Sequence, residues 1–108
     1  MDKWVLEVGT NCLDAAREEE FNDWYDNIHL PDVLETPGFT GAVRYVNTAA
    51  AEGEAKFIAL YHIETEDIDA FMKLSNENLG KKREAGRFSD LLKIVSRGLY
   101  KQTSALYK

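Results

Sequence analysis

The stretch "AKFIALYHIET", residues 55–65, places apolar side chains on both faces of a predicted strand. Successive side chains of a strand point to opposite faces of the sheet. The residues on one face are Phe57, Ala59, Tyr61 and Ile63, and those on the other are Ile58 and Leu60. Helices can cover only one face, and a soluble monomer rarely leaves a large apolar face in water. The stretch therefore predicts a strand whose sheet has helices on one face and a second sheet on the other.

Three further strands are expected around this one. Residues 39–48, "FTGAVRYVNT", lie a short polar connection away, which predicts a hairpin with residues 55–65. Residues 3–11 alternate with Trp4, Leu6 and Val8 on one face, and the last strand is expected over about residues 97–107.

Helical spacing predicts the segments between these strands. Asp14 offers an N-cap for a helix over residues 15–28. Its apolar stripe, at positions i, i+3, i+4 and i+7, consists of Phe21, Trp24, Tyr25 and Ile28. Because a proline disfavours helical geometry in the residue before it, the helix should break at Leu30, and a short helix should follow over residues 31–35.

A second helix is expected after residue 65, with Thr65 as its cap and Gly80 as an interruption. A further helical segment before the last strand is predicted by the same spacing in Phe88, Leu91, Leu92 and Val95. The element order is then β-α-β-β-α-β, which is typical of an α+β, ferredoxin-like domain with a four-stranded antiparallel sheet in which the first and third strands are central. Residues 1–108 should form this single domain, and two copies should pair sheet to sheet as a homodimer.

Composition excludes several classes of partner. With 44% hydrophobic and 30% charged residues the chain is typical of a globular protein, and its net charge of −6 disfavours binding to nucleic acid or to an anionic membrane. No apolar run approaches a membrane span, and the first residues lack the pattern of a secretory signal, so a cytoplasmic location is expected. The single Cys12 excludes an intramolecular disulfide and a thiolate zinc cage.

The candidate chemistry lies in "WYDNIHLPDVLETPGF", residues 24–39. His29 follows Tyr25 by one helical turn, so Trp24, Tyr25 and His29 can share the side that faces the sheet. Asp32 lies three residues further on and is a candidate to orient the imidazole. The alternative is structural: His29 caps the end of the first helix, and Asp32 favours the beginning of the next turn.

Four strand residues are further candidates for binding a substrate: Arg44, Tyr45, Tyr61 and His62. Adjacent strand residues point to opposite faces, so at most one of each neighbouring pair can line a given pocket. A buried tyrosine suits an aromatic substrate and a core equally well. No metal-binding spacing joins His29 and His62, and no phosphate loop or dinucleotide motif is present, so neither a metal nor a cofactor is expected.

Residues 20–45, "EFNDWYDNIHLPDVLETPGFTGAVRY", resemble the dimeric α+β barrel superfamily, whose small bacterial members show an F-x-x-W-Y-x-x-x-H-x-P-D run followed by P-G-F. The later "VSRGLY", residues 95–100, is similar to the start of the last strand in that group. The resemblance implies two ferredoxin-like halves whose sheets close into one barrel, with a pocket between sheet and helices. The superfamily includes cofactor-free monooxygenases, polyketide cyclases, isomerases, EthD-type proteins and haem enzymes. The resemblance therefore leaves the reaction open.

Three functions follow from these observations. The first is a cofactor-free isomerase, cyclase or lyase in which His29 transfers a proton on a hydrophobic aromatic or polyketide-like carbonyl compound. Asp32 would orient His29, and Trp24 and Tyr25 would form the pocket wall. The second is a cofactor-free monooxygenase of an electron-rich phenol or quinol. The third is a non-catalytic dimer that binds a small ligand or assists a pathway partner, and it predicts a filled interface between sheet and helices.

Overall fold

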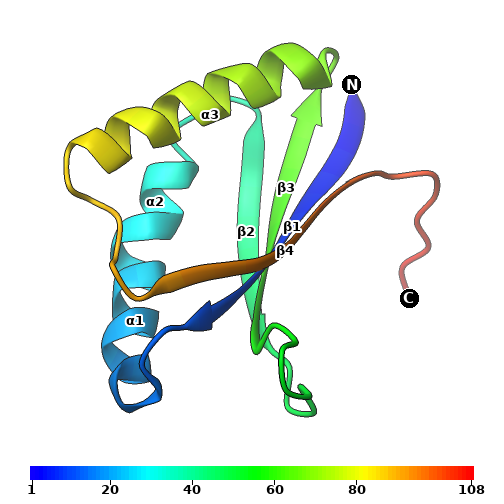
Figure 1. Cartoon of the computed structure of the whole chain (residues 1–108). Helices are drawn as coiled ribbons and strands as arrows, with labels where there is room; N and C mark the ends of the chain where they lie inside the picture. The colour runs from blue at the N-terminus through cyan, green and yellow to red at the C-terminus, as the bar shows by residue number, and fades with distance from the viewer.

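The structure, a computed structural model that describes residues 1–108, contains the predicted four-stranded antiparallel sheet (Figure 1). Its strands are β1 (Asp2–Cys12), β2 (Phe39–Val46), β3 (Phe57–Thr65) and β4 (Leu92–Lys101). They lie in the order β2-β3-β1-β4, so the first and third strands are central, as predicted. The β2–β3 hairpin is confirmed by the antiparallel pairing that runs from Phe39 and Ile63 to Val46 and Phe57.

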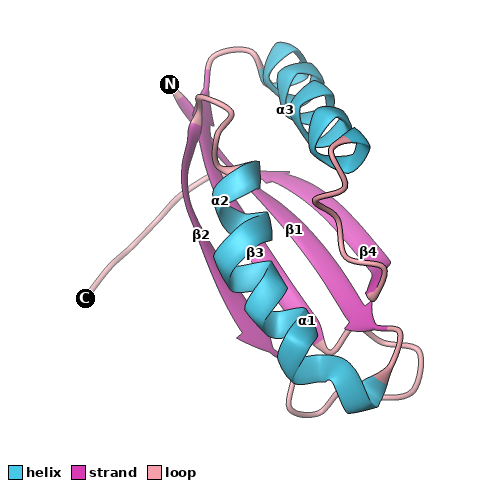
Figure 2. Cartoon of the chain, turned by 90° about the vertical axis from the view of Figure 1, so that its left-hand side faces the viewer, coloured by secondary structure: helices cyan, strands magenta, loops and turns pink.

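Helices cover one face of the sheet, and the hydrophobic core lies between them (Figure 2). The α+β, ferredoxin-like arrangement expected from the sequence is thereby confirmed. The helix-covered face of β3 is buried throughout: its members are Phe57, Ala59, Tyr61 and Ile63. Phe21 from the first helical segment packs against this face with no exposed surface, and Phe71 packs from the second helix. No helix has the length and apolar character needed to cross a membrane.

The first helical segment does not break at Leu30. It runs through a 3₁₀ turn η1 (Ala15–Arg17), α1 (Glu18–Trp24), a π-helical turn η2 (Tyr25–His29) and α2 (Leu30–Val33). Leu30 keeps helical angles, φ −58° and ψ −49°, and its N–H donates to the carbonyl of Tyr25, five residues earlier. We attribute the continuity to this wider turn, because Pro31 has no N–H to donate and an α-helical proline crowds the carbonyl four residues before it.

The π-helical turn also changes which side chain faces the sheet. An α-helical stripe that includes Phe21 and Tyr25 continues at Ile28. In the structure Ile28 is 37% exposed, whereas His29 is only 8% exposed. The wider turn therefore leaves Ile28 outside the inward stripe, whereas His29 keeps the inward side that its spacing of four residues from Tyr25 predicts.

The second helix and the last strand differ from the prediction. The helix α3 (Ile68–Glu84) continues through Gly80, and its N-cap is Asp67, whose side chain accepts from the N–H of Ala70. Gly86, with φ +75°, follows the end of the helix in the left-handed conformation that favours glycine. The helix predicted over residues 88–95 is wrong, because β4 begins at Leu92, which pairs with Cys12 of β1.

A one-residue bulge interrupts the pairing of β4 with β1. Thr10 pairs with Ile94, and the next residue toward the N-terminus, Gly9, pairs with Ser96, so Val95 is the extra residue. A bulge shifts the alternation of side chains by one position. Ile94 and Arg97 consequently point to the same, helix-covered face of the sheet, although they are three residues apart.

Candidate active site

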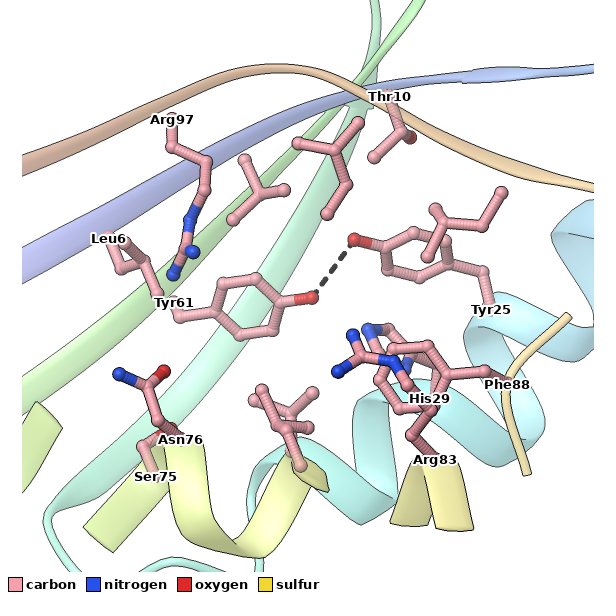
Figure 3. Close-up of a pocket in the computed structure, with 15 residues that line it drawn as sticks. Leu6, Thr10, Tyr25, His29, Tyr61, Ser75, Asn76, Arg83, Phe88 and Arg97 are labelled. Carbon is pink, nitrogen blue, oxygen red and sulfur yellow. Dashed lines mark hydrogen bonds between the residues drawn. The ribbon is translucent and has the colours of Figure 1, made fainter. Parts of the chain in front are cut away.

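A cavity of about 340 Å³ lies between the helix-covered face of the sheet and the helices (Figure 3). Its 15 lining residues come from β1, β3, β4, α3, the two segments around His29 and the loop after α3. This volume lies within the range of small-molecule sites. The cavity brings together Tyr25, His29 and Tyr61 from the sequence-predicted candidates.

His29 forms part of the cavity wall and is held there by aromatic rings. Its ring stacks on Trp24 with the centroids 4.8 Å apart, and it meets the rings of Tyr25 and Phe88 edge to face at 4.9 and 5.3 Å. Neither ring nitrogen makes a hydrogen bond within the chain, and neither belongs to the fully buried unpartnered polar atoms, so both stay accessible. The packing therefore fixes the ring and leaves its nitrogens free for a ligand.

Burial lowers the pKa of His29 from the ordinary value of 6.5 to about 4. Loss of hydration, which disfavours the charged imidazolium, is the largest cause. The Asp32 carboxylate opposes it by raising the pKa, and the Arg44 guanidinium adds to it. At neutral pH the ring is consequently uncharged and has a nitrogen lone pair that can accept a proton.

Asp32 does not make the orienting contact expected with His29. Its carboxylate accepts two hydrogen bonds from Arg87, from Nε at 2.6 Å and from Nη2 at 3.0 Å, and Lys82 lies 4.0 Å away. The hydrogen bonds from Arg87 are the main reason that the pKa of Asp32 lies below its usual value. Asp32 does not line the cavity and makes no hydrogen bond to His29, so it acts on His29 through its charge alone.

The hydroxyl groups of Tyr25 and Tyr61 face each other in the cavity, with their oxygens 3.0 Å apart (Figure 3). Burial is the main cause that raises the pKa of both phenols, so both stay protonated at neutral pH. One hydroxyl donates to the other, and the proton of the accepting hydroxyl remains free. The pair can therefore donate one hydrogen bond to an oxygen atom in the cavity.

Trp24 and Arg44 support these residues and do not line the cavity. Trp24 lies behind His29, and its Nε1 donates to the carbonyl of Arg87 at 2.9 Å. Arg44 places its guanidinium 4.0 Å from the centre of the Tyr25 ring. It also donates to the side chains of Asn22 and Asp26, each at 2.9 Å. Trp24 thus packs against His29, and Arg44 packs against Tyr25, from outside the cavity.

Tyr45 and His62 lie on the opposite face of the sheet, away from the cavity. Tyr45 pairs across the strands with Ile58, and His62 pairs with Val5. Both side chains are exposed on the face that the helices leave open. Tyr61 and His62 point to opposite faces of the sheet, as the alternation of strand residues predicts. The prediction that Tyr45 and His62 line the substrate pocket is wrong for this cavity.

Two basic residues of the cavity, Arg83 and Arg97, were not identified from the sequence. Arg83 continues a stripe of α3 in which Ser75, Leu79 and Arg83 recur every four residues, so helical spacing alone predicts its direction. The expected break at Gly80 concealed this stripe. Arg97 reaches the cavity because of the bulge in β4, for which the local sequence gives no clear sign.

Comparison with known proteins places the chain in a family. Its sequence matches the family described as a domain of unknown function, DUF4286, over residues 4–102. The chain belongs to this family. No curated protein matches the sequence of this DUF4286 chain.

Solved structures with the same fold include three dimeric α+β barrel proteins. HapK from Hahella chejuensis superposes with a TM-score of 0.71 at 16% identity, over 97% of each chain. SnoaB, a cofactor-independent oxygenase from Streptomyces nogalater, gives 0.70 at 16% identity over the whole of both chains. MhuD, a haem degrader from Mycobacterium tuberculosis, gives 0.66 at 14% identity over 96% of this chain and 99% of its own. The predicted resemblance to this superfamily is confirmed at the level of fold.

Proposed function

We propose that the protein is a cofactor-independent enzyme in which neutral His29 removes a proton from a small hydrophobic carbonyl compound. The observation that carries the proposal is the free imidazole at the wall of a cavity that also contains the Tyr25–Tyr61 hydroxyl pair. An acceptor for the proton and a donor for the resulting oxyanion thus lie in one partly enclosed space. General base catalysis and oxyanion stabilisation are the two elements that enolate formation needs.

The proton transfer follows directly from these groups. A ring nitrogen of His29 takes a proton from the carbon next to the substrate carbonyl. The electron pair of that C–H bond moves into the enolate, and the negative charge settles on the oxygen. The free hydroxyl proton of the Tyr25–Tyr61 pair donates to this oxygen. Return of the proton to another atom gives isomerisation, and attack of the enolate on a second carbonyl gives cyclisation.

Oxygenation of a phenol is the second candidate, because it begins with the same loss of a proton. The similarity in fold to SnoaB, a cofactor-independent oxygenase, favours it. In that scheme the phenolate would pass its electrons to molecular oxygen, so an oxygen electrode would record uptake during turnover of a naphthalenediol. The non-catalytic alternative predicted a filled interface between sheet and helices, and the cavity argues against it.

The test is exchange of the acidic C–H protons of 2-tetralone in deuterated water, followed by NMR. We expect the protein to accelerate the exchange and the His29→Gln variant to lose about 10²- to 10⁴-fold of the acceleration. Ile28→Gln is the matched control, because it places the same side chain at the neighbouring outward position and should keep the activity. Equal exchange rates for His29→Gln and the unmodified protein would refute the assignment of His29.

We propose in addition that the active form is a homodimer joined through the open face of the sheet. This face carries half-buried Ile58 and Leu60 at its centre and exposed Val43, Tyr45 and Tyr100 around them. Such a surface is typical of an interface. The cavity lies on the other face, so pairing through the open face would leave its opening unobstructed.

A further inference from the structure

We propose that the substrate is an anion, specifically an apolar carboxylic acid in its ionised form, whose carboxylate is bound by Arg83 or Arg97 at the cavity wall. This inference rests on the proposed function of the cavity and names the class of compound that the cavity takes. It depends on which charged side chains the structure places at the cavity and on which partners they have.

The ion pairs of the chain single out these two residues. The sequence contains five arginines, and three of them, Arg17, Arg44 and Arg87, are paired with carboxylates at 2.8, 2.9 and 2.6 Å. The remaining two are Arg83 and Arg97, and both line the cavity. An arginine fork matches a carboxylate in geometry, and charge-assisted hydrogen bonds are stronger than neutral ones. The two arginines that have no carboxylate partner within the chain are thus also the two that line the cavity, where a ligand can supply the carboxylate.

The cavity contains no acidic side chain to neutralise them. None of its 15 lining residues is an aspartate or a glutamate, although the chain has 19 acidic residues and a net charge of −6. His29 is uncharged at neutral pH, and the tyrosine pair is protonated. Two positive charges consequently stand at an otherwise neutral cavity in an acidic protein, which favours an anionic ligand over a neutral or cationic one.

Each arginine is aimed by a specific feature of the fold. The bulge at Val95 turns Arg97 onto the helix-covered face, and Figure 3 shows it extending from β4 toward the cavity. Arg83 lies in the last turn of α3, with its guanidinium 4.6 Å from the centre of the Phe88 ring. Phe88 in turn contacts His29 edge to face, so this charge lies next to the proposed base.

The remaining wall fits the apolar part of such an acid. It is formed mainly by aliphatic side chains from the sheet, α2 and α3: Leu6, Val8, Val33, Leu79, Leu92 and Ile94. An aromatic or branched aliphatic body can pack against this wall while its carboxylate meets an arginine. Binding of a carboxylate would also stabilise the protonated form of His29, so it would make the imidazole a stronger base.

The test compares 2-naphthoate with 2-naphthamide, two probes of nearly the same shape of which only the first is charged at pH 7.5. Isothermal titration calorimetry would measure both with the unmodified protein and with Arg83→Gln, Arg97→Gln and Arg17→Gln. Arg17→Gln is the matched control, because Arg17 pairs with Glu20 at the surface and lies outside the cavity. Circular dichroism would verify that each variant is folded.

We expect 2-naphthoate to bind at least about tenfold more tightly than 2-naphthamide, and we expect Arg83→Gln or Arg97→Gln to remove most of this preference. Arg17→Gln should keep it. Equal affinity for the two probes would overturn the proposal, as would a preference for 2-naphthoate that survives both cavity variants. The measurement needs no turnover. A preference for 2-naphthoate alongside unchanged proton exchange in His29→Gln would refute the catalytic proposal alone.

Discussion

Replacing His29 with glutamine should change how the stability of the protein depends on pH. Burial lowers the pKa of this imidazole from 6.5 to about 4 in the folded protein. Between these two pH values the unfolded chain binds a proton at position 29 and the folded chain does not. The free energy of unfolding therefore falls as the pH falls through this window. At about 1.4 kcal/mol per pH unit, the full loss is about 3 kcal/mol.

The assay is urea-induced unfolding at a fixed protein concentration, at pH 7.5 and at steps down to pH 4. The quantity of interest is the difference in unfolding free energy between the unmodified protein and His29→Gln. Carboxylates titrate in both proteins, so their contribution cancels in this difference. The substitution also removes the stacking on Trp24, which lowers stability at every pH. The difference should therefore be largest at pH 7.5 and should shrink by about 3 kcal/mol toward pH 4.

Ile28→Gln provides the control, because it introduces the same side chain next to His29 without removing a titratable group. Its difference from the unmodified protein should stay constant over the same pH range. If the difference for His29→Gln were equally constant, the imidazole would not be buried in its neutral form. The argument for a neutral proton acceptor in the cavity would then fail.

Three other substitutions test the site and the open face. Tyr61→Phe leaves the buried hydroxyl of Tyr25 without its partner, so it should lower the free energy of unfolding by about 1–3 kcal/mol in urea unfolding. It should also slow the proton exchange of 2-tetralone, and unchanged exchange would contradict the role of the hydroxyl pair. Asp32→Asn should lower the free energy of unfolding at pH 7, because Arg87 holds the pKa of Asp32 below its usual 3.8. The deficit should disappear as the pH falls below that value. A deficit independent of pH in urea unfolding would refute this. Tyr45→Lys should convert the dimer to a monomer in analytical ultracentrifugation. The control Leu74→Lys, on α3 and likewise 55% exposed, should remain a dimer. A monomeric unmodified protein would refute the interface.

The first three strands could be predicted because their signal is local, whereas the last strand was expected over residues 97–107 and runs over Leu92–Lys101. Alternation of apolar and polar residues predicted β1 over residues 3–11, and the short polar connection to residues 55–65 predicted β2 over residues 39–48 as their hairpin partner; the structure has Asp2–Cys12 and Phe39–Val46. The order of the elements, typical of a ferredoxin-like domain, also predicted the central place of β3, which the strand order confirms. The positions of these strands depend on each strand's own residues, so one sequence is enough to show them.

The last third of the chain was harder to predict because distant pairing decides it. Leu91 and Leu92 fit a helical spacing, yet the carbonyl of Leu91 accepts from the N–H of Leu13, and Leu92 pairs with Cys12. Pairing with a central strand satisfies a whole row of backbone groups, whereas a short helix leaves its end groups unpaired. The misassigned helix is also why Arg97 was not placed near His29.

In the candidate site, too, contacts between residues distant in the sequence could not be predicted. His29 and its aromatic neighbours Trp24 and Tyr25 could be identified because all three lie within one helical turn and a half. Asp32 is equally close in the sequence, but its carboxylate is held by Arg87, 55 residues further along the chain. Proximity in sequence therefore indicated a contact with His29 that a more distant, charged partner replaces.

Two backbone irregularities affect the direction of side chains at the site, and they differ in how far the sequence reveals their result. The π-helical turn leaves Ile28 37% exposed although helical spacing placed it in the apolar stripe, and His29 stays on the inward side that its spacing of four residues from Tyr25 predicts. The bulge at Val95 brings Arg97 to the helix-covered face where regular alternation would bring Ser96. A regular strand would therefore turn Arg97 away from the cavity. Irregular turns and bulges are common at functional sites. The proposed base could thus be found from helical spacing, whereas one of the two proposed anion-binding groups depends on a bulge that hydrophobic periodicity does not reveal.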